Sequence, residues 1–352
     1  TAAMSEQQFK LVGTLQNETP LYLDGRAEWT GAVDTVPSTA ALNFKGPLNA
    51  LAFDATTDGF LMARADGDVD ITDPALAFSA NVDHGEKRLS PESELRIESG
   101  ALNVSGSMKV VKIRYELRGN TGANEKLTLN VEGQASGLDA MDDGIDGSFD
   151  YRIGHPLLLE SALEGRTVVA LKNDRLTIEN ITEAPFASEL EASLNPGDFD
   201  QQATAAISWN NFRVPGIPGA DLVAQNGQLR FNGTPAAATV SLNSVWSHSE
   251  YGLARIDTSG ILNEKKLSLS NGFAELLNGT IDFAGLVDWR QIPSANLTVD
   301  AKQIDVSVLR PELDARINLA AEARLDAPAS GLQTSIALKQ LTGTWLGQKL
   351  VA

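Results

Sequence analysis

Apolar and polar residues alternate along much of the chain. In residues 126–133, polar positions separate Leu127, Leu129 and Val131. The same alternation recurs in residues 267–269, 280–283, 296–300 and 335–339. Successive side chains of a strand point to opposite faces of a sheet, so each segment has one apolar and one polar face. Such alternation is typical of antiparallel sheets with one solvated face, and it predicts β-strands.

Short turn signals punctuate these segments. Asn-Gly pairs begin at Asn226, Asn232, Asn271 and Asn278, and Asp-Gly pairs begin at Asp24, Asp58, Asp66 and Asp143. Because these residues tolerate the positive φ of tight hairpins, we expect turns at these pairs. The strands between them are expected to have about five or six residues and to span about 17–20 Å. The best helix candidate is a single turn at residues 308–310, which ends at Pro311.

Glycine often follows a short alternating strand, but the spacing between such units is not fixed. This arrangement indicates a continuous meander, whereas a parallel β-helix shows a tighter repeat. The predicted fold class is therefore all-β, a long antiparallel repeat-like meander with few or no helices. No change of composition divides residues 1–352, so we interpret them as a single elongated segment with no internal boundary, an internal fragment of a longer chain.

Charge and composition exclude several function classes. The net charge is −18, with 28 Lys and Arg against 46 Asp and Glu. This balance argues against nucleic acid as a partner and against a surface that holds anionic lipid headgroups. The chain has no cysteine, which removes disulfides, thiolate nucleophiles and sulfur metal ligands. No apolar run approaches the roughly 18 residues that a membrane-spanning helix needs.

Candidate catalytic chemistry is sparse. The three histidines, His84, His155 and His248, are far apart in sequence and have loop-like neighbours, so we interpret them as surface or loop residues. A catalytic histidine needs a nucleophile and an orienting carboxylate, and no nucleophile elbow or zinc-protease motif is present. We therefore predict no catalytic residue, no metal site, no cofactor and no enzymatic activity. Paired carboxylates for glycoside hydrolysis can be neither assigned nor excluded from spacing.

One acidic loop, residues 138–147, resembles a calcium loop in part. Asp139, Asp143 and Gly144 fall at positions one, five and six of such a loop, but Met141 takes the third ligand position. A solvated hairpin connection is the favoured interpretation. The five tryptophans, Trp29, Trp209, Trp246, Trp289 and Trp345, are widely spaced, which favours packing on a sheet face over a carbohydrate platform.

The succession of segments in the C-terminal third resembles a known family. Gly-Leu-Val-Asp-Trp at residues 285–289 is followed by an alternating strand at 295–301, the segment Leu-Arg-Pro-Glu-Leu at 309–313 and another strand at 317–323. The run Leu-Lys-Gln-Leu-Thr-Gly-Thr-Trp-Leu-Gly-Gln-Lys-Leu closes the piece at 338–350. Residues 106–119 and 173–181 are similar in style. This succession resembles the TamB family, the inner-membrane subunit of the translocation and assembly module, and its AsmA-like relatives.

The resemblance implies a β-taco, a sheet curled into an open groove with an apolar interior. It implies a periplasmic location, with the parent protein anchored in the inner membrane of a Gram-negative bacterium. The implied roles are phospholipid transport between the inner and outer membranes and outer-membrane protein assembly. The implied partners are phospholipid acyl chains and an outer-membrane barrel of the TamA/Omp85 type, which is contacted through regions outside this fragment.

Strand parity selects candidate groove-lining residues. They are the apolar members of the alternating segments: Leu127, Leu129, Val131, Leu229, Phe231, Val240, Leu242, Leu267, Leu269, Ile281, Phe283, Val287, Trp289, Leu297, Val299, Ile336 and Leu338. Two other hypotheses remain open at this point. One is a structural β-scaffold or adhesin with a dry core, since a filled sandwich needs the same alternation as an open groove. The other is an all-β carbohydrate-active enzyme.

Overall fold

A computed structural model describes most of the chain. The described residues are 7–17, 19–33, 36–88, 96–120, 126–139, 144–154, 162–197, 201–213, 222–234, 236–250, 252–263, 265–289, 294–326 and 333–351. Contacts between residues divide the chain into two compact units, Thr1–Asn173 (unit 1) and Asp174–Ala352 (unit 2).

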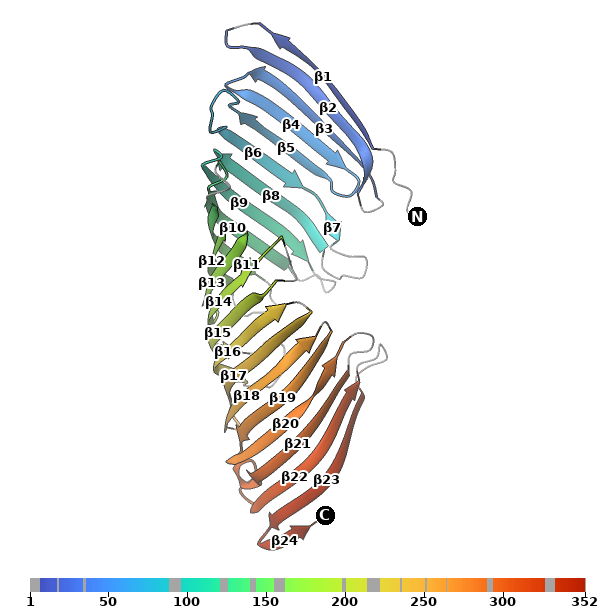
Figure 1. Cartoon of the computed structure of the whole chain (residues 1–352), viewed down its shortest axis with the longest axis vertical. Coiled ribbons are helices and arrows are strands. Elements are labelled where there is room, and N and C mark those ends of the chain that lie inside the picture. The colour runs from blue at the N-terminus through green and yellow to red at the C-terminus, as the bar shows by residue number, and fades with distance from the viewer. Residues whose placement is uncertain are drawn as a thin grey trace. The chain divides into compact units, whose positions relative to one another are not determined.

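Unit 1 is a meander of antiparallel strands (Figure 1). The strands are β1 (Gln8–Gln16), β2 (Tyr22–Val33), β3 (Val36–Pro47), β4 (Leu51–Asp58), β5 (Ala63–Val69), β6 (Phe78–His84), β7 (Lys87–Arg88), β8 (Arg96–Gly106), β9 (Val110–Asn120), β10 (Lys126–Ser136), β11 (Ile145–Gly154) and β12 (Leu163–Lys172). Each strand pairs with the next one along the chain, except that β6 and the short β7 both pair with β8.

Unit 2 repeats this architecture (Figure 1). Its elements are β13 (Arg175–Ala184), β14 (Ala187–Leu194), β15 (Ala203–Arg213), β16 (Val223–Thr234), β17 (Ala237–His248), β18 (Gly252–Asn263), β19 (Lys266–Leu276), β20 (Gly279–Asp288), β21 (Ser294–Asp305), η2 (Val306–Val308), β22 (Ala315–Asp326), β23 (Gln333–Trp345) and β24 (Gln348–Val351). Every strand from β13 to β23 pairs antiparallel with its successor.

The predicted fold class is confirmed. Within the described ranges the only helical element is η2, a single 3-10 turn at Val306–Val308 that overlaps the turn predicted at residues 308–310. No described pairing joins β1 to β12 or β13 to β24, so neither unit closes into a barrel. Each unit is an open antiparallel meander of the kind that curls into a groove.

In the described residues, a single layer of side chains covers the apolar side of the strands, and no second sheet packs on it. The fully buried apolar residues in the described part are mainly small ones, such as Ala224, Ala238, Ala301 and Ala315. A two-layer sandwich buries large side chains such as Leu, Ile and Phe in its core. Of the large apolar side chains in the described part, Leu51, Val111, Leu117 and Ile304 are buried, and most of the others remain partly exposed.

The predicted strand length is wrong. Most strands in both units have ten to thirteen residues, about twice the expected length. At about 3.3 Å per residue, a twelve-residue strand is about 40 Å long. The error follows from treating Asn-Gly and Asp-Gly pairs as turns.

Only two of those pairs in the described residues lie at turns. Asn278 precedes β20 and has positive φ together with Leu277, as a tight two-residue hairpin requires, and Gly59 has φ +104° directly after β4. The pairs that begin at Asp24, Asp66, Asn226, Asn232 and Asn271 lie inside strands β2, β5, β16 and β19. Asp143 lies outside the described residues. At four of these five strand glycines, Gly25, Gly67, Gly227 and Gly272, the glycine provides room for a ring from the neighbouring strand.

Register shifts interrupt the pairing at several points in unit 2. One lies between Leu269 and Gly272 in the β19–β20 pair, and others occur in β16–β17, β18–β19, β21–β22 and β22–β23. A β-bulge adds an unpaired residue and so changes which positions of the strand face a given side. In β19, Leu267 and Leu269 share a face with the even-numbered Gly272, Ala274 and Leu276 beyond the bulge. The apolar residues therefore stay on one side although their parity changes.

Candidate functional site

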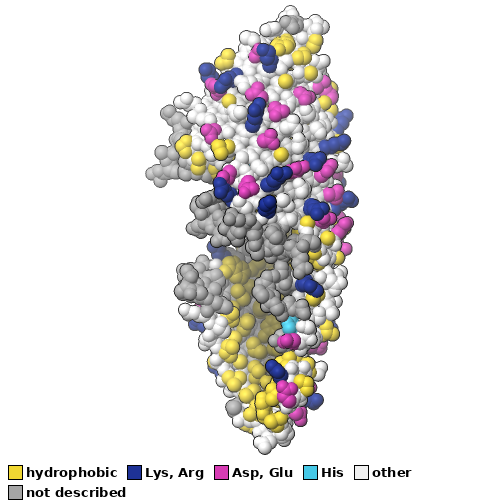
Figure 2. All heavy atoms as spheres, turned by 180° about the vertical axis from the view of Figure 1, so that it is seen from behind, with side chains coloured by type: hydrophobic (Ala, Val, Ile, Leu, Met, Phe, Trp, Pro, Cys, Tyr) yellow, Lys and Arg dark blue, Asp and Glu magenta, His cyan; other side chains and the backbone are white. Residues whose placement is uncertain are grey.

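An apolar row crosses the strands of unit 2. Residues that lie opposite one another on neighbouring antiparallel strands point to the same face. The pairing of β14 through β23 lines up Leu190, Ile207, Leu229, Leu242, Thr258, Gly272, Phe283, Val299, Ala321 and Leu338. Hydrophobic side chains gather in a hollow on this C-terminal part of the molecule, in the lower half of Figure 2. This open face is the apolar groove of unit 2.

Unit 1 carries an equivalent row. The register from β1 to β11 places on one face Leu11, Ala27, Leu42, Ala55, Ala65, Val82, Leu102, Tyr115, Val131 and Tyr151. The next position along each strand points to the other face, where the row is Val12, Arg26, Asn43, Asp54, Asp66, Asn81, Asn103, Arg114, Glu132 and Asp150. The two sides of the sheet thus differ sharply in polarity.

The predicted groove-lining residues can be placed on these faces. In unit 1, Leu127, Leu129 and Val131 lie on the apolar side of β10 and are half-buried. In unit 2, the register joins all the candidates within strands on one face: Leu229, Phe231, Val240, Leu242, Leu267, Leu269, Ile281, Phe283, Val287, Leu297, Val299, Ile336 and Leu338. Trp289 follows the end of β20. Whether these residues contact a lipid stays a prediction.

Burial is not uniform across these candidates. Most are half-buried, but Ile336 is 69% exposed and Leu338 is 54% exposed. Both lie on the part of β23 that pairs only with β22, because β24 covers residues 342–345 alone. In the described residues, this part of β23 is therefore paired on one side alone.

Several residues of this face are missed by sequence reasoning. Val111, Ile113, Tyr115 and Leu117 alternate cleanly in β9 and could have been found by the same rule. The small residues are different, because Ala224 and Ser244 are fully buried on the apolar face yet carry no hydrophobic signal of their own. Their position depends on pairing between strands, which the sequence pattern does not reveal.

A polar pair lies on the apolar face of unit 1. His84 is the last residue of β6, so its interpretation as a surface or loop residue is wrong. Its Nδ1 donates to the carbonyl oxygen of Gly85 at 3.2 Å, and Nε2 lies 2.8 Å from the hydroxyl of Tyr115. Burial raises the pKa of the Tyr115 hydroxyl above its ordinary value. His248 ends β17 and accepts a hydrogen bond from the backbone N–H of Glu250, while His155 lies outside the described residues.

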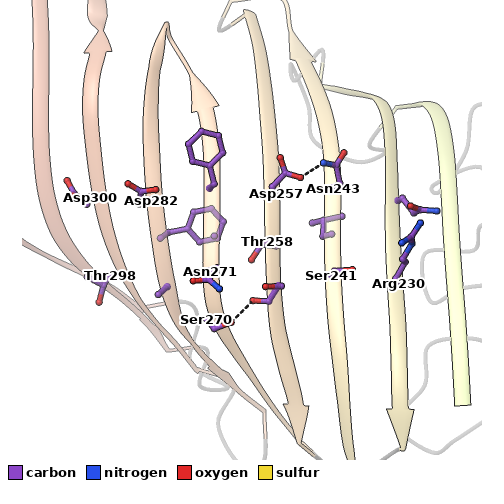
Figure 3. Close-up of a pocket in the computed structure, with 17 residues that line it drawn as sticks. Arg230, Ser241, Asn243, Asp257, Thr258, Ser270, Asn271, Asp282, Thr298 and Asp300 are labelled. Atoms are coloured by element: carbon purple, nitrogen blue, oxygen red, sulfur yellow. Dashed lines mark hydrogen bonds between the residues drawn. The ribbon is translucent and has the colours of Figure 1, made fainter. Parts of the chain in front are cut away.

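The polar side of unit 2 also has a hollow, of about 690 Å³, between β16 and β21 (Figure 3). The ring of Phe273 lies opposite Asp257 on one side and Asp282 on the other. Asp257 accepts hydrogen bonds from Asn243 and from Arg255, and Lys302 lies 3.1 Å from Asp282 and 3.2 Å from Asp300. These contacts raise the pKa of Lys302. The carboxylates are thus held by neighbouring cations and amides.

The acidic loop connects β10 and β11, as the hairpin interpretation predicts. Ser136 pairs with Asp146 across it, and Gly144 has φ +102°. Met141 and Asp143 of the calcium interpretation lie outside the described residues. In the part of the chain that the structure describes, no group of three His, Asp or Glu side chains is placed to hold a metal ion.

The family model described as "TamB, N-terminal domain" matches residues 162–352. The match covers more than half of the chain, from the start of β12 through the whole of unit 2. The chain belongs to the TamB family. No curated protein and no solved structure gives a significant match. The resemblance in residues 106–119 lies outside the matched region and stays a prediction.

Membership of the TamB family has general consequences. It associates the chain with membrane assembly and lipid transport, in a family of periplasmic proteins anchored in the inner membrane. The family is not known for enzymatic activity. Among the described residues, no helix has the length and hydrophobicity to cross a bilayer. The more specific role of this chain is a matter for proposal.

Proposed function

We propose that the apolar face of this TamB-family chain is a groove that carries phospholipid between the inner and outer membranes. The observation that carries the proposal is the row of apolar side chains that runs from strand to strand on an open face in each unit. Through this transport the protein, together with an outer-membrane barrel partner of the TamA type, also supports outer-membrane protein assembly.

The energetics favour a continuous apolar surface over a single binding pocket. Exposing an acyl chain of about a dozen methylenes to water costs roughly 10 kcal/mol, at about 0.8 kcal/mol per CH₂. A carrier surface has to offset this cost at every step, because any polar gap would act as a barrier. The half-buried side chains of Leu229, Leu242 and Val299 offer such contact without closing over the occupant.

Two features favour the open groove over a scaffold with a dry core. Most of the large apolar side chains on this face stay partly exposed, and five of the nine buried apolar residues in the described part are alanines. A dry core would exclude water from residues such as Phe283 and Leu297, which are only half-buried. An exposed apolar face of this extent marks a binding surface.

A matched pair of photo-crosslinkers tests the proposal. A crosslinker at Phe283 faces the groove, and one at Asp282 faces the other side of the same strand. The chain is incubated with vesicles of phosphatidylethanolamine and phosphatidylglycerol, irradiated, and the adducts are identified by mass spectrometry. Phospholipid adducts are expected at Phe283 and not at Asp282.

A second pair in unit 1, Val131 and Glu132, repeats the comparison on β10. Adducts are expected at Val131 only. Equal labelling on both faces in both units would refute the assignment of the groove.

A further inference from the structure

Rings on the apolar face are repeatedly paired with glycine. In the described residues, six Phe or Trp residues lie directly opposite a glycine on the neighbouring strand: Phe44 and Gly25, Phe53 and Gly67, Phe78 and Gly106, Phe149 and Gly133, Trp209 and Gly227, and Phe283 and Gly272. The pairs occur in both units. An aromatic ring opposite a strand glycine covers the exposed backbone of the glycine and helps to fix the pairing register of the two strands.

In five of these pairs the ring leans over its glycine, and the exception is Gly106, where an added Cβ would meet the backbone of Val110. A Cβ atom added to Gly272 would lie 2.2 Å from Cε2 of Phe283, and one added to Gly227 would lie 2.2 Å from Cζ2 of Trp209. A Cβ added to Gly25 would lie 2.4 Å from the Phe44 ring. The rings therefore occupy the space that a side chain would fill. Gly272 is buried as a result, although it has no side chain of its own.

This position of the ring affects the depth of the groove. A ring that lies across the neighbouring strand covers the floor, whereas a ring that is pushed off the glycine has to rise from the floor. At Gly272 the three closest atoms are all in the Phe283 ring, so an added methyl group would displace that ring.

We propose that these glycines determine the clearance of the groove, because each allows the opposite ring to lie flat beneath a bound acyl chain. The pair of Gly272 and Phe283 is the clearest case. This inference rests on the proposed function, since clearance matters only if a chain occupies the groove. Gly272, which has no side chain, thereby has a specificity-determining role in the passage of lipid.

The test measures lipid capture next to the pair. A crosslinker at Val299, which lies opposite Phe283 on β21, reports occupancy at this point, and a crosslinker at Leu129 reports occupancy in unit 1. The full chain is irradiated with the same phosphatidylethanolamine and phosphatidylglycerol vesicles. Gly272→Ala is expected to lower capture at Val299 about tenfold, which corresponds to ~1.4 kcal/mol, and to leave capture at Leu129 unchanged.

A second substitution separates clearance from general damage. The double variant Gly272→Ala/Phe283→Ala has no ring to displace. Capture at Val299 should therefore return to within about twofold of the parent, a much smaller difference than the tenfold loss (~1.4 kcal/mol) expected for Gly272→Ala alone. Gly13→Ala is the matched control, because a Cβ there meets no atom closer than 3.4 Å. It should leave capture unchanged at both positions.

The outcomes are distinguishable. Suppose that the parent captures lipid at both Val299 and Leu129. If Gly272→Ala then shows no loss, or the double variant shows no recovery, the clearance role is overturned and the proposed lipid groove still stands. Absence of lipid at both positions in the parent would overturn the proposed function itself. If Gly272→Ala does not fold, Gly25→Ala with and without Phe44→Ala repeats the test in unit 1, with the crosslinker at Leu42.

Discussion

The hydroxyl of Tyr115 on β9 lies 2.8 Å from Nε2 of His84 on β6, although these two strands are not paired with each other. The contact passes over β8 at Gly100, where an added Cβ would lie 2.0 Å from Nε2 of His84. The two rings are stacked, with centroids 6.0 Å apart. A glycine in the middle strand thus lets two side chains meet across it.

Tyr115→Phe is expected to lower the free energy of unfolding by about 1 kcal/mol, because it removes a partly buried hydrogen bond. Gly100→Ala displaces the His84 ring and breaks the same bond. The double variant should therefore lose about 1 kcal/mol less than the sum of the single variants. Urea denaturation of the four proteins measures this coupling, and strict additivity would contradict it.

Alkaline pH should destabilise the protein partly through Tyr115. Burial raises the pKa of this hydroxyl above 10.0, so the unfolded state releases the proton first as the pH rises. The stabilisation is complete below pH ~10 and is lost as the pH rises through the folded-state pKa. The free energy of unfolding is measured by denaturation at about pH 8 to 11, a range that includes the ordinary tyrosine pKa. It should fall more steeply with pH for the parent than for Tyr115→Phe. Equal slopes would mean that Tyr115 makes no contribution.

Thr258→Val is expected to stabilise the protein by up to about 1 kcal/mol. The hydroxyl of Thr258 is buried on the apolar face, and within the described residues it has no hydrogen-bond partner. Ser244→Ala is the matched comparison, because the Ser244 hydroxyl is also buried but donates to the carbonyl oxygen of Asn226 at 2.9 Å. It should cost about 1 kcal/mol. Thermal and urea unfolding of both variants measure the difference, and a destabilised Thr258→Val would contradict the prediction.

Acid should destabilise the end of β21 through Asp305. A hydrogen bond from the Ser307 hydroxyl lowers the pKa of this carboxyl below 3.8, with further help from the Ser307 backbone N–H. The resulting stabilisation is present above pH ~4 and is lost as the pH falls through the folded-state pKa. Asp305→Asn should show a weaker loss of stability on acidification than the parent. Parallel dependence in the two proteins would refute this role.

Polar substitution should be tolerated on the edge of β23 that pairs with β22 alone. Ile336 is 69% exposed, so Ile336→Ser should cost less than about 0.5 kcal/mol. Leu297 lies two strands away on the same row and is half-buried, and Leu297→Ser should cost at least about 1.5 kcal/mol. Urea midpoints provide the comparison. A large cost at Ile336 would show that another element covers this edge.

The sequence predicts the strands and their apolar faces well, because alternation is a local property. Leu127, Leu129 and Val131 identify a face without any knowledge of what lies beside it. The positions of Asn226-Gly227 and Asn271-Gly272 could not be predicted in this way. A turn and a ring-covered strand site both favour glycine, and only the partner strand distinguishes them.

The histidine is a similar case. The sequence around His84, with Asp83 before it and Gly85 after it, reads as a loop. The structure places the side chain over Gly100 and against Tyr115, which are 16 and 31 residues away along the chain. Contacts of this kind depend on register, and register is set by the whole sheet.

The bulges of unit 2 have an evolutionary consequence. A single-residue insertion or deletion in a regular strand would turn every later side chain to the wrong face, and selection should remove it. At the bulges near Leu269 and Ala301 the parity already changes. Length differences of one residue between homologues should therefore concentrate at such positions. Because of the bulges, strands of TamB-family chains can gain or lose single residues during evolution while the groove stays apolar. Alignments of the family should therefore permit gaps inside strands as well as in loops.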